Sequence, residues 1–267
     1  MILSLFPGVG LLDRAFEDCG WCVVRGPDAL WGGDVRKFFP PARHFAGVIG
    51  GPPCQNFSTV NRNRDFAGGM ELVNEFLRIV GAASPDWWLM ENVPGSPRGV
   101  TVPGYVTQHF TLDASHVGSE QHRLRVFHYG HRPGTRELVI ARPGASQPGT
   151  SQRACLASEG RRAGRRTWGH FCELQGLPPG FDLPPFKVVE KYRAVGNGVP
   201  YPLALALALA IGDSGRAVTP RATCACGCGA FVTGKRRLAG EACRQRMHRA
   251  GQTVKRNPPA ASQLVLV

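Results

Sequence analysis

The sequence predicts an α/β protein with a doubly wound, mostly parallel sheet. Short apolar segments alternate with stretches of helical spacing, and turns rich in glycine and proline separate them. The 267 residues are enough for one well-buried α/β domain and a small appendage. In such a sheet, functional residues are expected along the carboxyl ends of the strands.

The elements follow in order along the first half of the chain. A strand is predicted at residues 2–6, and the apolar spacing of residues 11–19 predicts a helix that Gly20 ends. Further strands are predicted at 21–24, 45–49, 86–90, 107–112 and 125–129, and a further helix over 72–80. The Ala/Leu run at 203–211 predicts a buried core helix, because a membrane span needs about 20 residues.

Charge indicates an anionic partner. The formal net charge is +13, most simply explained by nucleic acid binding. Residues 131–170 contain eight arginines against two glutamates, and residues 216–267 contain ten lysines and arginines against one glutamate, so the rest of the chain is close to neutral. This division predicts basic segments that contact phosphates, attached to a neutral body.

Several side chains follow predicted strands. Cys54 lies in the stretch GGPPCQNFS, where two prolines stiffen the turn, and Glu91 ends the next predicted strand. Arg123 and Arg125 share one face of a later strand by the period of two. Taken alone, each residue has a structural reading: Cys54 as a buried inert thiol, the arginines as a solvated edge, and Asp34 as a helix N-cap.

Together these motifs resemble one family, the cytosine-C5 methyltransferases that use S-adenosylmethionine. The matching stretches occur in the family's order: Phe6–Gly10, Gly33–Val35, Gly51–Gln55, Glu91–Val93, Gln121–Arg125, Glu173–Pro178 and Gly196–Val199. The resemblance covers roughly residues 1–130 and 168–211 and implies a Rossmann-like methyltransferase sheet. Leu11 stands where the family often has a third glycine.

The resemblance also implies roles for individual residues. Cys54 would add to C6 of cytosine while Glu91 protonates or hydrogen-bonds N3. Arg125 would hold the cytosine O2, Arg123 would steady the Cys54 loop, and base flipping is implied. The residues expected to position the substrate are Pro53, Gln55, Ser58 and Gln121. The residues expected to bind S-adenosylmethionine are Phe6, Gly8, Gly10, Asp28, Asp34, Pro53 and Asn197, with Asp28 the nearest candidate for the ribose.

Composition and motifs divide the chain into three parts. Residues 1–130 and 168–212 form the predicted catalytic domain, residues 131–167 a reduced target-recognition segment, and residues 213–267 a basic Cys-rich tail. A zinc ribbon is predicted at 222–250, with a short helix that carries one of the ligands. The candidate zinc ligands are Cys224, Cys226, Cys228 and Cys243, with His248 as an alternate. A metal-free basic tail is the other reading.

We therefore expect a monomeric DNA cytosine-C5 methyltransferase that acts on double-stranded DNA and has no membrane as a partner. No secretory signal pattern is seen at the start, so a cytoplasmic location is expected, in a bacterium or in the host of a phage. Two alternatives stay open. The first is an RNA (tRNA) cytosine-C5 methyltransferase, which a small recognition segment would also suit, and the second is an inactive relative that binds DNA.

Overall fold

The computed structural model describes residues 1–58, 61, 63–134, 137–140, 152–213, 222–223, 231–232 and 241–249. Its main sheet has six strands in the order β2-β1-β3-β4-β6-β5. The strands are β1 (Ile2–Leu5), β2 (Val23–Arg25), β3 (Gly47–Gly50), β4 (Trp87–Asn92), β5 (Val106–Asp113) and β6 (Leu124–His131). The main helices are α1 (Leu11–Asp18), α2 (Phe66–Ala83), α3 (Trp168–Leu174), α4 (Val188–Asn197) and α5 (Tyr201–Asp213).

Strand direction agrees with the predicted α/β class. The first four strands pair in parallel, whereas β6 pairs antiparallel with both β4 and β5. Leu5 pairs with Gly50 and Gly50 with Met90, so β1, β3 and β4 end at the same edge of the sheet. The start of β6 lies at that edge too, because Val126 pairs with Asn92.

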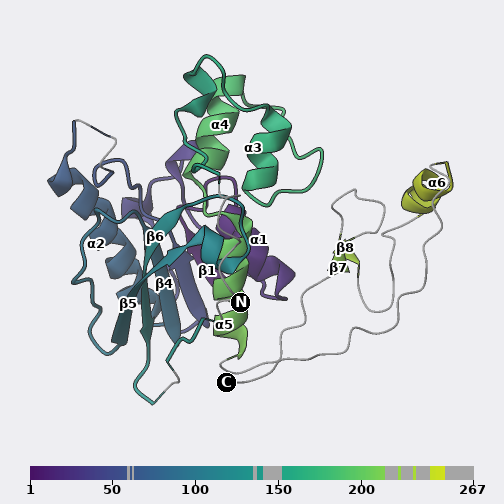
Figure 1. Ribbon diagram of the computed structural model, residues 1–267. Helices are drawn as coiled ribbons and strands as arrows, with labels where there is room; N and C mark the ends of the chain where they lie inside the picture. The colour runs from purple at the N-terminus through teal and green to yellow at the C-terminus, as the bar shows by residue number, and fades with distance from the viewer. Residues whose placement is uncertain are drawn as a thin grey trace. The chain divides into compact units, whose positions relative to one another are not determined.

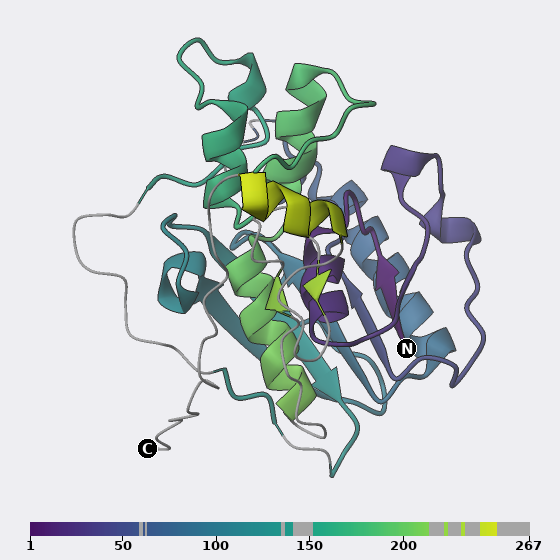
Figure 2. The same ribbon diagram turned by 90° about the vertical axis from the view of Figure 1, so that its right-hand side faces the viewer.

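Helices cover both faces of the sheet. In Figures 1 and 2, α2 lies on one face and α1 and α5 lie on the other. The fully buried Phe76 and Ile79 of α2 pack with Val48 and Trp88 on the first face, and α1 and α5 pack with Ile49 and Phe127 on the second. Alternate strand residues point to opposite faces, which is why near-continuous apolar strands are needed here.

The connection from β4 to β5 is short. Residues 93–105, all of them described, run as a loop without a helix. Val100 and Val102 of this loop are buried in the core on the α2 side. The loop thus covers sheet surface that a crossover helix would cover in a regular α/β unit.

A group of helices that we call the helical lobe (residues 152–177 and 181–197) lies beyond the edge where the parallel strands end (Figure 1). It contains α3, α4 and the short turn η4 (Glu159–Arg161), and its core joins Cys155, Phe171 and Tyr192. Gly160 packs so tightly that a Cβ would lie 3.0 Å from Tyr192 Cβ. Residues 152–167, predicted as part of a separate recognition segment, therefore share their core with α3 and α4.

The Ala/Leu helix α5 is a core helix, as predicted. By length and composition, Val188–Gly212 could cross a membrane. However, half of the apolar stretch is already buried inside the protein, and the helix is interrupted between Asn197 and Tyr201. Leu203 and Leu207 are fully buried against the sheet. Burial in the protein core accounts for this apolar composition.

A second compact unit comprises residues 178–180 and 221–267. Its described elements are the antiparallel pair β7 (Ala222–Thr223) and β8 (Phe231–Val232), and the helix α6 (Glu241–Arg249). The short helix that carries Cys243 is confirmed. Cys224, Cys226 and Cys228 lie outside the described residues.

Candidate active site

A cavity of about 640 Å³ lies along the edge where β1, β3 and β4 end. Ligand sites for small molecules typically have volumes of roughly 300–1,000 Å³. Its walls come from the turn after β1, the loop after β2, the turn after β3 and the end of α4. Of the residues predicted from sequence, it is lined by Phe6, Gly8, Asp28, Asp34, Pro53, Cys54, Gln55, Glu91 and Asn197.

The turn after β1 is tightly fixed around Gly8. Phe6 and Gly8 have φ of 53° and 56°, a left-handed conformation that is uncommon for a bulky residue such as phenylalanine. The Gly8 N–H donates to Asp28 Oδ2 at 2.7 Å, and the Gly8 carbonyl accepts from Trp31 Nε1 at 2.7 Å. Both polar groups of this residue's backbone are therefore used by the loop after β2.

Gly10 has a structural role at the start of α1. It caps α1 with φ of 77° and is buried, but it does not line the cavity. A Cβ at this position would lie 2.6 Å from the Arg25 guanidinium. Glycine is thus favoured here by the turn and by the approach of Arg25, and cofactor binding by Gly10 stays a prediction.

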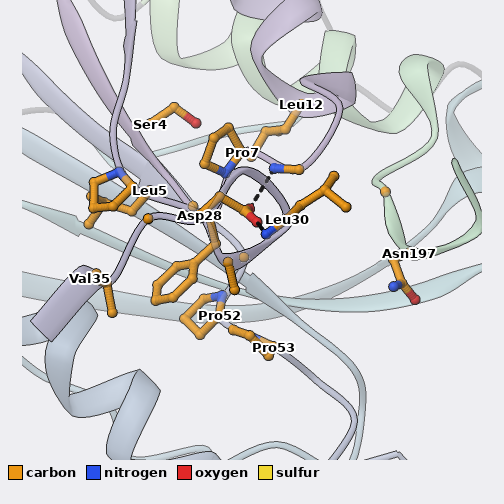
Figure 3. Close-up of a pocket in the computed structure, with 18 of the residues that line it drawn as sticks. Ser4, Leu5, Pro7, Leu12, Asp28, Leu30, Val35, Pro52, Pro53 and Asn197 are labelled. Atoms are coloured by element: carbon orange, nitrogen blue, oxygen red, sulfur yellow. Dashed lines mark hydrogen bonds between the residues drawn. The ribbon is translucent and has the colours of Figure 1, made fainter. Parts of the chain in front are cut away.

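Two carboxylates lie on the loop after β2. Asp28 accepts from Gly8 N and from Leu30 N, each at 2.7 Å, as the dashed lines in Figure 3 show. Asp34 accepts from Arg36 N at 3.1 Å, and this hydrogen bond, with the nearby Arg36 charge, lowers the pKa of Asp34. Both carboxylates line the cavity, and a carboxylate oxygen can accept more than one hydrogen bond.

Asn197 reaches the cavity from the far end of the chain. It is the last residue of α4 and is exposed, and Figure 3 shows it on the opposite side of the cavity from Asp28. The cavity therefore joins residues separated by most of the catalytic domain.

Cys54 lies at the other end of the cavity, in the turn after β3. Its thiol is half-buried, and its carbonyl accepts from the N–H groups of Phe57 and Ser58, each at 3.0 Å. Burial and then the charge of Glu91 raise the pKa of the Cys54 thiol, while Arg125 and Arg123 oppose this shift. A thiol with a raised pKa is unreactive unless the site stabilises the thiolate.

Glu91, on β4, is buried next to this thiol and pairs with Arg125. Arg125 Nε lies 2.7 Å from Glu91 Oε1. Burial raises the pKa of Glu91 despite the nearby charges of Arg125 and Arg123. The opposing arginine keeps a carboxylate possible, and burial favours the protonated acid, which is what a proton donor requires.

Gln121 and Arg123, which precede Arg125 by four and two residues, fasten the helical lobe to the sheet. Gln121 is fully buried and bonds to the carbonyl of Leu174, the Gln175 side chain and the Cys155 N–H. These bonds hold the lobe next to the site, and the substrate-positioning role expected for Gln121 stays a prediction.

The buried Arg123 donates to the carbonyls of Cys155, Gly196 and Gly198, the last two flanking Asn197. Burial lowers its pKa to about 9, so the guanidinium stays charged at neutral pH. Its described hydrogen bonds go to the lobe and to the segment after α4. The expected support of the Cys54 loop by Arg123 is thus limited to its charge, which acts on the thiol and on Glu91.

Two supporting residues were not predicted from the sequence. Asp13 of α1 is fully buried and accepts from Ser4 Oγ and, at 2.8 Å, from Arg25 Nε. The sequence does contain a signal for a buried carboxylate, because Asp13 falls among the apolar residues of a short helix. Trp31 is 61% exposed and packs edge-on against Phe186 with ring centroids 5.7 Å apart, and an exposed tryptophan beside a glycine-rich loop could have marked it.

Within the described parts of the chain, no group of three or more His, Cys, Asp or Glu residues could hold a metal ion. Cys243 and His248 are on α6, but the three other predicted zinc ligands are outside the described residues. The zinc ribbon stays a prediction.

The family model for C-5 cytosine-specific DNA methylases matches residues 33–97. The type II methyltransferase M.AquIA of Picosynechococcus sp. is 37% identical over an alignment of 180 residues. The match covers 50% of this chain and 72% of that protein. M.AgeI of Thalassovita gelatinovora is 39% identical over an alignment of 171 residues that covers 50% of this chain and 40% of M.AgeI. M.NgoPII of Neisseria gonorrhoeae is 32% identical over an alignment of 165 residues that covers 49% of this chain and 48% of M.NgoPII. The chain thus spans less than half of the length of M.AgeI and M.NgoPII.

Solved structures show the same fold. Entamoeba histolytica methyltransferase EhMeth matches with a TM-score of 0.56 and 12% identity, over 79% of this chain and 97% of that chain. A mutant of Spodoptera frugiperda DNMT2 matches with a TM-score of 0.52 and 16% identity, over 77% and 97%. The sheet is therefore that of a Rossmann-like methyltransferase, and on the sequence match to M.AquIA the chain belongs to the C-5 cytosine-specific DNA methylases.

Proposed function

We propose that this protein transfers a methyl group from S-adenosylmethionine to C5 of cytosine in double-stranded DNA. One observation carries the proposal: Cys54 and Glu91, which pairs with Arg125, line the same cavity as Phe6, Asp28 and Asn197. The similarity to the type II methyltransferases M.AquIA, M.AgeI and M.NgoPII supports methyl transfer as the activity.

The cavity suits this cofactor. Phe6 and Val35 provide apolar surface for an adenine ring, and the carboxylates of Asp28 and Asp34 can accept from hydroxyl and amino groups. Asn197 adds an amide from the other wall. When bound, S-adenosylmethionine supplies the methyl group, and Pro53 lies between its site and Cys54.

The residues at the thiol end can activate cytosine. The Cys54 thiolate forms a bond to C6, the C5–C6 π electrons move to C4–C5, the C4–N3 π electrons move onto N3, and N3 takes the proton of Glu91. Arg125 Nε pairs with Glu91 and Nη1 donates to the Leu124 carbonyl, which leaves Nη2 to donate to the cytosine O2. C5 then becomes nucleophilic enough to accept the methyl group. Transfer of the C5 proton to a base such as water, return of the N3 proton to Glu91 and cleavage of the S–C6 bond, which frees the Cys54 thiolate, restore the ring. The base must leave the helix to reach the thiol.

DNA contact is proposed for the exposed face of the helical lobe. Arg161, Arg162 and Arg165 are exposed there, and their charge suits phosphate groups. Gln55 and Ser58, beside the thiol, are proposed to position the flipped base. We further propose a monomer in the bacterial or phage-host cytoplasm whose tail, with or without zinc, adds affinity for DNA.

The test uses the full chain with labelled S-adenosylmethionine and either duplex DNA or tRNA, followed by digestion to nucleosides. We expect 5-methyl-deoxycytidine from DNA, and none with Cys54→Ser. Label found only as 5-methylcytidine from tRNA would contradict the DNA substrate. Full activity of the Cys54→Ser variant would contradict the covalent mechanism, and no label in either nucleic acid would favour a binding protein without turnover.

A further inference from the structure

The turn that carries Cys54 contacts the end of β4 and the segment that follows it, both through residues that precede Cys54 in the sequence and through residues that follow it. Before it, Asn92 Nδ2 donates to the Pro52 carbonyl at 3.2 Å, and Asn92 is fully buried. Gly51, one residue further back, faces Glu91: a Cβ there would lie 2.9 Å from Glu91 Oε2. The proton donor and the nucleophile are thus held by neighbouring backbone.

After the thiol, Phe57 anchors the turn. Its side chain is 1% exposed, and its ring lies edge-on to Phe66 with centroids 5.2 Å apart. Gly69 of α2 lies under the ring, where a Cβ would be 2.7 Å from Phe57 Cζ. The ring therefore has little room to move, and the Phe57 N–H bond to the Cys54 carbonyl at 3.0 Å transmits its position to the thiol residue.

The carbonyl of Phe57 rests on Gly95, four residues after Glu91. A Cβ on Gly95 would overlap the Phe57 carbonyl oxygen, well inside van der Waals distance. A side chain at position 95 must therefore push the Phe57 peptide away, because backbone cannot give way as the end of a flexible side chain can. Gly95 is exposed and has no left-handed φ, so contact with Phe57 is what requires glycine at this position.

We propose that Gly95 and Phe57 are positioning residues that set the place of the Cys54 thiol relative to Glu91. The inference deepens the proposed function and rests on it. Phe57 fixes the far end of the turn to α2, and Gly95 lets the turn close down onto the segment that carries Glu91. Neither residue lines the cavity, so the proposed effect acts through the Cys54 turn and not through the cofactor site.

The test compares Gly95→Ala with Gly99→Ala. Gly99 is an exposed glycine in the same loop with ordinary φ, and a Cβ there would have no atom within 4 Å, so it is a matched control. We expect kcat of Gly95→Ala to fall about 10- to 100-fold, because misplacement of a reacting group by about 1 Å can cost 10²-fold. The Kd for S-adenosylmethionine should stay within about twofold of the wild-type value, and Gly99→Ala should match wild type in both.

A second variant guards against misfolding of the first. Phe57→Leu keeps an apolar side chain but loses ring contacts with Phe66 and Gly69, and we expect the same loss of kcat at unchanged cofactor Kd. Wild-type kcat in both variants would overturn the inference, as would a parallel loss of cofactor binding, which would indicate general disruption. An inactive wild-type chain would instead contradict the proposed function, so the two failures are distinguishable.

Discussion

Replacement of Arg123 by methionine tests whether the helical lobe depends on one buried guanidinium. The change removes the donors to the carbonyls of Cys155, Gly196 and Gly198 and leaves an apolar side chain of similar length. Arg123 is 3% exposed, so water cannot replace the lost donors without opening the lobe.

The expected magnitude follows from these three acceptors. A buried group left without its partner costs about 1–3 kcal/mol, so three carbonyls give a gross loss of roughly 3–9 kcal/mol. Release of a buried charge opposes it, since burial lowers the pKa of Arg123 to about 9. We therefore expect a net loss of about 2–4 kcal/mol in the free energy of unfolding. That corresponds to a fall in Tm of roughly 5–15 °C for a domain of this size.

Thermal unfolding at neutral pH measures this loss, with Arg161→Met as the control because Arg161 is exposed on the same lobe. Since two of the carbonyls flank Asn197, Arg123→Met should also weaken binding of S-adenosylmethionine. A Tm within about 2 °C of wild type, with unchanged cofactor Kd, would refute the reasoning.

Three further predictions concern the cavity. Glu91→Gln should lower kcat by about 10²–10⁴-fold. Burial raises the pKa of Glu91 in the folded protein above its ordinary value of 4.5. The contribution of the protonated acid to stability is therefore fully present below pH 4.5 and is lost as the pH rises through the folded-state pKa. The variant should therefore be at least as stable as wild type at pH 8, and a lower Tm there would contradict this. Asp28→Asn should weaken S-adenosylmethionine binding about 10-fold by calorimetry, since an amide has one acceptor oxygen for the N–H groups of Gly8 and Leu30; unchanged affinity would remove Asp28 from the cofactor site. Trp31→Phe keeps a ring but loses the 2.7 Å bond to Gly8, so cofactor Kd should rise about fivefold with kcat retained, and a loss confined to kcat would argue against it.

The meeting of Cys54 and Glu91 could be predicted from sequence for a topological reason. Each follows a buried apolar run of its own, and β3 and β4 are parallel neighbours. The carboxyl ends of such strands share one edge, so two local patterns suffice to place the side chains together. Phe6 and Asp34 were expected here from the family resemblance, and the cavity includes both.

The separate duties within Gln121–Arg125 could not be predicted from sequence. A period of two puts Gln121, Arg123 and Arg125 on one face but does not say what that face meets. The acceptors of Arg123 are 32 to 75 residues further along the chain, on the segment before η4 and at the end of α4. Only the packing of the lobe decides that the first two side chains bind the lobe and the third reaches Glu91.

The electrostatics of the site couple the thiol to the carboxyl group. The charge of Glu91 raises the pKa of Cys54, so ionisation of one group disfavours ionisation of the other. Arg125 and Arg123 lower the pKa of both groups and so favour one shared negative charge. That charge is carried either by the carboxylate beside a thiol or by the thiolate beside a carboxylic acid. In the proposed mechanism the second arrangement attacks C6 and protonates N3, and it differs from the first by the position of one proton. Reaching it would leave the net charge of the buried site unchanged, which would keep the desolvation cost of activation small.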